Sequence, residues 1–325
     1  MKPNIIKQTV VLTVALIGVS QTVLGLDTQG SSSAYGLSAD TRLSDLNTLL
    51  GIGVGVTLAP TPTASGVAPP PYSFSNTLAS VTANASSALL GRGSISNSSG
   101  VLNVSASSTV NGGTGSRNAQ ASSSVANFNS SVGLTGRASL LNTVNFFTFN
   151  GLTLSSSASV SGDYNAFTTS GGSVIIDANG AGDGFTTFNI LGVNFNVAVD
   201  SLGQVAPNTT LNINSASSAL FSDSLGTDLT GSLSIILNEQ ILTGDGITSR
   251  GLEVNALHVN FNDAGASFFN LLGVKIDDAN LVNGGFIVGH SQAALVAVPE
   301  PSTVGLLALG GCLAFLRIRS PFFKG

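Results

Sequence analysis

The sequence predicts an all-β protein, built as an antiparallel β-sandwich or jelly roll. Apolar and polar residues alternate along 193–199 and again along 233–237, a period of two that is typical of strands with one buried face. Asn-Gly and Asp-Gly pairs, which favour tight hairpins, recur between such segments. An irregular β-solenoid is the alternative, because similar aromatic-Gly segments begin at Phe147, Phe188 and Phe269, although their spacing is uneven.

The alternation assigns the strand faces. We expect one core to contain Val193, Phe195, Val197 and Val199 together with Leu233, Ile235 and Leu237, and the opposite face to carry Asn194, Asn196 and Asp200. By the same pattern, we expect Leu102 and Val104 to share one face of a strand, and likewise Val174 with Ile176 and Leu211 with Ile213. Turns are expected at Asn111-Gly112-Gly113, Gly171-Gly172, Asn179-Gly180, Asp183-Gly184, Asp245-Gly246 and Asn283-Gly284-Gly285.

The segment before this sheet has a different composition. Thr41–Leu50 is compatible with one short helix, and Ala59–Pro71 contains five prolines, which favours a stiff loop. We therefore expect residues 26–72 to form an N-terminal arm and a Pro-rich loop, and residues 73–297 to form a single β domain.

The N-terminus has the three parts of a secretory signal peptide. Lys2 and Lys7 precede the apolar stretch Thr9–Val19, and Val23-Leu24-Gly25 follows it as the expected cleavage site. We expect residues 1–25 to be a signal helix that is cleaved after Gly25, so that the protein is exported.

The C-terminus carries a second apolar segment. Residues 303–316 are apolar or small and precede Arg317 and Arg319, and Lys and Arg are retained on the cytoplasmic side of membranes. Fourteen residues reach only about 21 Å in a helix, short of the ~30 Å hydrocarbon layer, so a C-terminal core helix is the alternative. We expect a transient or weak membrane helix within 298–325, because the arginines can extend the span by snorkelling.

Two resemblances follow from these residues. The C-terminal segment resembles the PEP-CTERM sorting signal of bacterial surface proteins in Val298, Pro299, Glu300, Pro301, Ser302, Arg317 and Arg319. That resemblance implies processing by an exosortase-type enzyme. The series 205–210, 237–240, 251–259 and 287–293, most specifically the strand Asn255-Ala256-Leu257-His258, resembles the choice-of-anchor P family of exported β-proteins. The second resemblance covers roughly 151–297 and implies a location and a fold, but no activity.

Composition restricts the partners. Between Leu26 and Pro301, 6 basic residues face 16 acidic ones, a net charge of −10, which argues against nucleic acid and anionic lipid as partners. The chain has no Trp and only 3 Tyr, so a deep aromatic sugar cleft is not expected, whereas shallow contact with a polysaccharide through Ser, Thr and Asn is compatible with this composition. The only cysteine, Cys312, lies in the C-terminal apolar segment, which leaves the exported part without a disulfide.

Few residues are candidates for chemistry. His258 is expected to share a strand face with Leu252, Val254 and Ala256, as a structural histidine would, and His290 is expected to be exposed. Glu239 and Glu253 are the only glutamates between the end signals, and a glycosidase would need such a pair about 5–10 Å apart. The stretch 177–184 has Asp and Asn among glycines, as a Ca²⁺ loop does, but it has Ala181 at the fifth place and no bidentate Glu after it.

The sequence therefore predicts no catalytic, cofactor-binding or metal-binding residue. The expected function is that of a structural or adhesive protein of the bacterial cell surface or extracellular matrix. A module that binds polysaccharide or calcium is the alternative, and a polysaccharide hydrolase is the third option.

Overall fold

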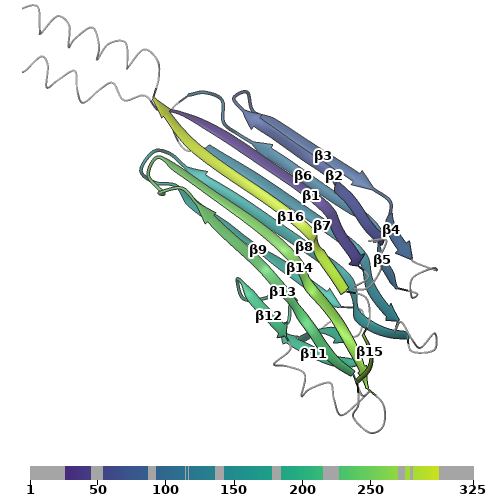
Figure 1. The fold of residues 1–325 in the computed structure, drawn as a ribbon. Helices are drawn as coiled ribbons and strands as arrows, with labels where there is room; N and C mark the ends of the chain where they lie inside the picture. The colour runs from purple at the N-terminus through teal and green to yellow at the C-terminus, as the bar shows by residue number, and fades with distance from the viewer. Residues whose placement is uncertain are drawn as a thin grey trace, which may run out of the picture.

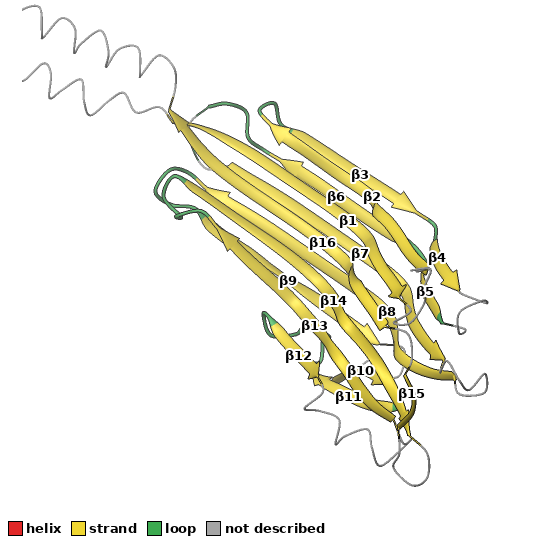
Figure 2. Cartoon of the chain, viewed as in Figure 1, coloured by secondary structure: helices red, strands yellow, loops and turns green. Residues whose placement is uncertain are grey.

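The computed structural model of this chain describes residues 26–44, 54–86, 93–113, 115, 117–135, 143–177, 184–214, 227–269, 275–278 and 281–299. Within these ranges the protein is all-β, and the strands pair antiparallel in two sheets that pack face to face in a sandwich-like arrangement (Figures 1 and 2). The antiparallel pairing fits the predicted sandwich, whereas a β-helix would stack its strands in parallel. None of the described residues belongs to a helix long and apolar enough to cross a membrane.

The first sheet has seven strands. Its order is β12 (Thr209–Asn214), β13 (Thr227–Thr243), β14 (Ser249–Phe269), β16 (Leu281–Pro299), β1 (Leu26–Ser44) and β2 (Val54–Ala68), and β15 (Lys275–Asp278) pairs with β14. Several of these strands have 17 to 21 residues, which at about 3.3 Å per residue corresponds to roughly 55–70 Å.

The second sheet has nine strands. Its order is β11 (Val193–Ala198), β10 (Phe185–Ile190), β8 (Thr143–Gly162), β7 (Arg117–Thr135), β5 (Ser94–Ser99) and β4 (Val81–Ser86). In addition, β9 (Thr168–Asp177) pairs with β8, and β3 (Tyr72–Leu78) pairs with β6 (Leu102–Ser108), which pairs with β7.

The N-terminal part of the chain belongs to the sheet, contrary to expectation. β1 lies between β16 and β2, and Pro60 and Pro62 lie within β2. Proline is tolerated there because β2 is the last strand at its edge and needs ladder hydrogen bonds on one side only. The expected arm and Pro-rich loop outside the sheet are therefore wrong. Thr41–Ser44 of the expected helix end β1, and residues 45–50 lie outside the described residues.

The pairing of β1 with β16 brings the two ends of the described chain together. Leu26 is the register partner of Pro299, and the pairing continues to Ser44 opposite Leu281. We call the end of the sandwich at which Leu26 and Pro299 lie the terminal pole (upper left in Figure 1). Leu26 and Pro299, the two ends of the described chain, therefore lie side by side at this pole.

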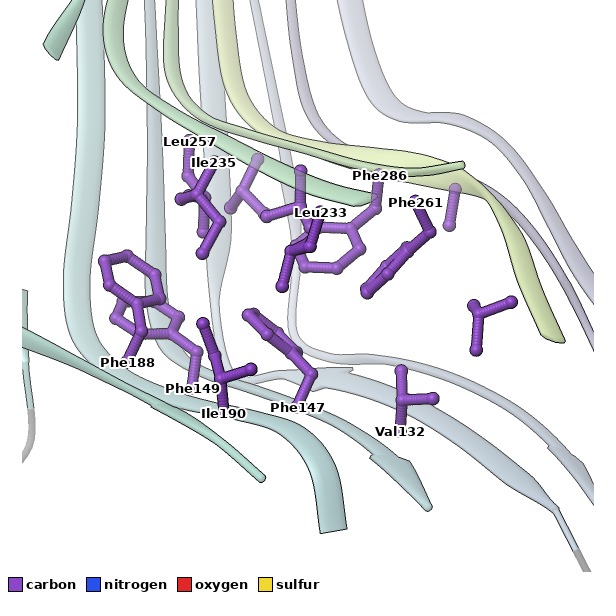
Figure 3. Packing of buried hydrophobic residues seen from close by; sticks show 14 of the residues in the cluster. Val132, Phe147, Phe149, Phe188, Ile190, Leu233, Ile235, Leu257, Phe261 and Phe286 are labelled. Carbon is purple, nitrogen blue, oxygen red and sulfur yellow. The ribbon is translucent and has the colours of Figure 1, made fainter. Parts of the chain in front are cut away.

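The core between the sheets changes along the strands. Away from the terminal pole the core is filled by phenylalanines, such as Phe147 of β8 and Phe261 of β14 (Figure 3). These two rings meet edge-on, with their centroids 5.8 Å apart. Nearer the pole, small residues such as Ala34 and Ala121 line the interface. There the sheets approach closely enough for the buried Ser156 and Ser291 hydroxyls to hydrogen-bond at 2.7 Å across the layers.

The predicted faces are correct for most strands. Leu233, Ile235 and Leu237 are buried in the main core cluster. Val193, Phe195, Val197 and Val199 are half-buried and pack against the same cluster, while Asn194, Asn196 and Asp200 are exposed. Leu102 and Val104 are buried, as expected. In β9 the prediction is reversed, because Ile175 is buried while Val174 and Ile176 are only half-buried.

Two of the predicted turns lie inside strands. Gly171-Gly172 is part of β9, and Asn283-Gly284-Gly285 is part of β16. Gly284 has φ +85°, and a Cβ there would overlap the carbonyl oxygen of Asp40 on β1. Its glycine therefore permits a kink and a close approach within the strand rather than a hairpin. Asn111-Gly112-Gly113 and Asp245-Gly246 do connect strands, as predicted, whereas 178–183 lie outside the described residues.

Candidate functional site

Both histidines and both glutamates of the β domain meet on the outer face of the seven-stranded sheet. Glu239 comes from β13, Glu253 and His258 from β14, and His290 from β16. These strands are adjacent, so four residues that span 52 positions of sequence become neighbours. We call this group the carboxylate–imidazole cluster.

A shift in the strand alternation creates the cluster. In β14, Leu252, Val254 and Ala256 face the core, but the next residue, Leu257, is also buried, so the following residue turns outward. His258 therefore lies on the face opposite to the one predicted. Comparable irregularities occur beside it, since Asn238 of β13 and Gly289 of β16 have positive φ angles of 50° and 67°, as in β-bulges.

Asn255 joins the members of the cluster. Its Nδ2 donates to Glu239 Oε2 at 2.8 Å and to Glu253 Oε1 at 3.3 Å, and its Oδ1 lies 2.7 Å from His290 Nδ1. The Asn255 side chain is almost completely buried, with 1% of the residue exposed. Because one amide nitrogen contacts both carboxylates, the two contacting oxygens lie within about 6 Å of each other.

The hydrogen bonds determine which imidazole nitrogen carries the proton. Since Asn255 donates through Nδ2, its Oδ1 accepts, and His290 must donate from Nδ1. His258 Nδ1 lies 3.0 Å from Glu239 Oε2 and donates to it. His290 is 8% exposed, so the expectation that it is exposed is wrong.

Burial and these hydrogen bonds shift three pKa values. The hydrogen bond from His258, assisted by the one from Asn255, lowers the pKa of Glu239 below its ordinary value of 4.5 despite partial burial. Burial lowers the pKa of His290 below 6.5, against the opposing effect of the glutamates. The ring of Tyr35 on β1 stacks on His290 with centroids 4.3 Å apart, and burial raises its pKa above 10.0. At neutral pH the cluster therefore holds an ionised Glu239 beside a neutral His290.

The cluster places its two glutamates at a separation within the range of glycosidases. Because the pKa of Glu239 is lowered, this carboxylate does not suit the role of general acid, which needs a raised pKa. Among the described residues, no three His, Cys, Asp or Glu side chains converge on a point that could hold a metal ion. The members of the cluster form a hydrogen-bonded polar network on the outer face of the sheet.

A groove on the nine-stranded sheet is the second candidate site. Its volume is about 910 Å³, and 10 of its 22 lining residues are serines. It crosses the outer faces of β3, β6, β7, β8 and β9 and is bordered by the loop residues 204–207 and by Gln240 of β13. No charged or aromatic residue is among the described residues that line it. We call it the hydroxyl groove.

The expected calcium loop is only partly described. Asp177 is buried, and its Oδ2 accepts a hydrogen bond from the backbone N–H of Thr187, so this carboxylate is turned into the protein. Residues 178–183 lie outside the described residues. Of the sorting-signal residues, Val298 and Pro299 end β16, and Glu300, Pro301, Ser302, Arg317 and Arg319 lie outside the described part of the chain.

Comparison with known proteins does not identify this chain. No family model and no curated protein matches it. Among solved structures, OccK5 (OpdH) of Pseudomonas aeruginosa aligns over 84% of this chain and 98% of its own, with 10% identity and a TM-score of 0.10. A similarity that weak carries no argument about fold or function.

Proposed function

We propose that this chain is an exported structural or adhesive protein of the bacterial cell surface or extracellular matrix, with a β-sandwich body sorted by an exosortase-type system. The observation that carries the proposal is the register of β1 and β16, in which Leu26 is paired with Pro299. A membrane segment attached after Pro299 would hold the terminal pole at the membrane. Strands of roughly 55–70 Å would then extend away from it, as a displayed surface module requires.

The end signals define the partners in this proposal. A leader over 1–25 would direct export, and Pro299-Glu300-Pro301 with the apolar segment and Arg317 would present the chain to the processing enzyme. The net charge of −10 between Leu26 and Pro301 supports solubility outside the cell and disfavours nucleic acid as a ligand.

The alternative of a polysaccharide-binding module is supported by the hydroxyl groove. It is compatible with an adhesive role, because a surface protein that binds a matrix polymer is adhesive. Calcium has no comparable support, since Asp177 already accepts a backbone hydrogen bond. Hydrolysis has less support, because the Glu239 carboxylate already accepts hydrogen bonds from Asn255 and His258.

The test is made in the native cell. An epitope tag inserted after the exposed Gly192, in the β10–β11 turn and away from the terminal pole, should be accessible to antibody on intact cells. Replacing Pro299, Glu300 and Pro301 by alanine should leave an unprocessed chain in the membrane and reduce cell aggregation. The control replaces Pro60, Thr61 and Pro62 of β2 by three alanines. A tagged chain found only in the cytoplasm, or aggregation that is unaffected by deletion of the gene, would contradict the proposal.

A further inference from the structure

The polar residues of the hydroxyl groove are arranged in rows that follow the register of the sheet. One row runs through Ser75, Ser105, Ser122, Ser157 and Gly172, which are direct partners on β3, β6, β7, β8 and β9. The next row runs through Thr77, Asn103, Ser124, Ser155 and Val174 on the same five strands. Neighbouring positions in a row are one strand apart, about 4.8 Å, and the two rows are two residues apart, about 6.7 Å.

The rows lie on the outer face of the nine-stranded sheet. Val104, Ala106 and Ala121, which alternate with row residues, are buried in the core between the sheets. Within the rows the side chains contact one another, since Ser105 and Ser122 share a hydrogen bond of 2.8 Å and Thr77 donates to Asn103 at 2.9 Å. Ser122 and Ser157, at the centre, are exposed.

The chemistry of the lining selects one class of ligand. A hydroxyl group both donates and accepts hydrogen bonds, so a row of serines can donate hydrogen bonds to the hydroxyl groups of a ligand and also accept hydrogen bonds from them. A charged polymer would find no counter-charge among the described lining residues, although the domain as a whole is strongly acidic. An apolar partner would leave the hydroxyls without hydrogen bonds, which is unfavourable.

We infer that the hydroxyl groove binds an uncharged polysaccharide chain, laid across the five strands along the polar rows. This inference rests on the proposed surface function and names the class of partner. Five strands at about 4.8 Å give an array of about 19 Å. The affinity should therefore rise with the length of an oligosaccharide until it spans the array. Longer oligosaccharides should then gain little further affinity per binding site.

Two variants close the groove without disturbing the core. Ser157→Glu introduces a charge at an exposed central position of the row. Gly172→Val adds bulk at the β9 end, where a Cβ has nothing nearer than the Gln240 amide nitrogen at 3.9 Å. Ser31→Glu is the matched control, because Ser31 is an exposed serine in the middle of the other sheet.

The experiment measures binding of the purified β domain, residues 26–299, to dextran and to cello-oligosaccharides of increasing length, with alginate and chitosan oligomers as charged probes. We expect the neutral glucans to bind, and each groove variant to weaken binding by at least about tenfold, with Ser31→Glu unchanged. Circular dichroism and the thermal midpoint check that the variants are folded. If a variant unfolds, NMR of the wild type decides, because a bound glucan must shift the side-chain amides of Asn103 and Gln240 and leave that of Asn194 unmoved.

Absence of binding to both neutral glucans, equal binding of alginate or chitosan, or shifts outside the groove would overturn the inference. These results are distinct from failure of the proposed function, which depends on where the tagged chain is found in cells. A displayed adhesive chain that ignores neutral glucans would refute only the groove assignment.

Discussion

Asn255→Ala tests whether the carboxylate–imidazole cluster is a single hydrogen-bonded unit. The substitution removes the donor shared by Glu239 and Glu253 and the acceptor of His290 Nδ1. A hydrogen bond to a charged group contributes about 1.5–3 kcal/mol, and a buried donor left without a partner costs about 1–3 kcal/mol. Water can reach part of the site, because the Glu253 side chain is 30% exposed. We therefore expect a loss near the lower end of the combined range, about 3 kcal/mol.

Chemical denaturation of the purified β domain at pH 7.5 measures this loss directly. For a domain of this size, each kcal/mol corresponds to about 2–4 °C, so the thermal midpoint should fall by about 6–12 °C. Asn194→Ala is the matched control, because Asn194 is exposed on β11 and its amide contact with Asn189 is at the surface. A loss below about 1 kcal/mol, or one equal to that of the control, would show that the cluster is not a cooperative network.

The free energy of unfolding should be greatest between pH 6.5 and 10.0. Below pH 6.5 the unfolded chain binds more protons than the folded one because the pKa of His290 is lowered, and the lowered pKa of Glu239 adds a further loss of stability below 4.5. Above pH 10.0 the unfolded chain loses protons first because the pKa of Tyr35 is raised. A series of urea midpoints that is flat from pH 5 to 7, or identical in His290→Gln, would contradict this. Phe147→Ala should cost about 3–5 kcal/mol, because this ring is fully buried between Phe188 and Phe261, whereas Phe185→Ala, at an exposed ring, should cost much less in the same denaturation assay. Gly284→Ala should destabilise the domain by about 1–3 kcal/mol, since its φ is +85° and a Cβ would meet the Asp40 carbonyl, while Gly172→Ala should be nearly neutral; equal thermal midpoints for the two alanine variants would refute the assignment of a kink at Gly284.

The local chemistry of the chain was sufficient to predict the class of fold and several strand faces. Leu233, Ile235 and Leu237 are buried and Asn194 and Asn196 are exposed because a strand places alternate side chains on opposite faces, and this period is visible in the residues themselves.

Only the tertiary structure determined the pairing and the sites. The prolines of β2 indicated a loop, but an edge strand satisfies its backbone on one side only and tolerates them. His258 was assigned to the wrong face because one additional residue at Ala256–Leu257 reverses the alternation, and such a shift depends on the neighbouring strands. The glycine at position 289 was a weak signal of that irregularity. The carboxylate–imidazole cluster and the serine rows require residues from three and five different strands, so their existence depends on strand order and register, which are long-range properties that alternation along one segment does not encode.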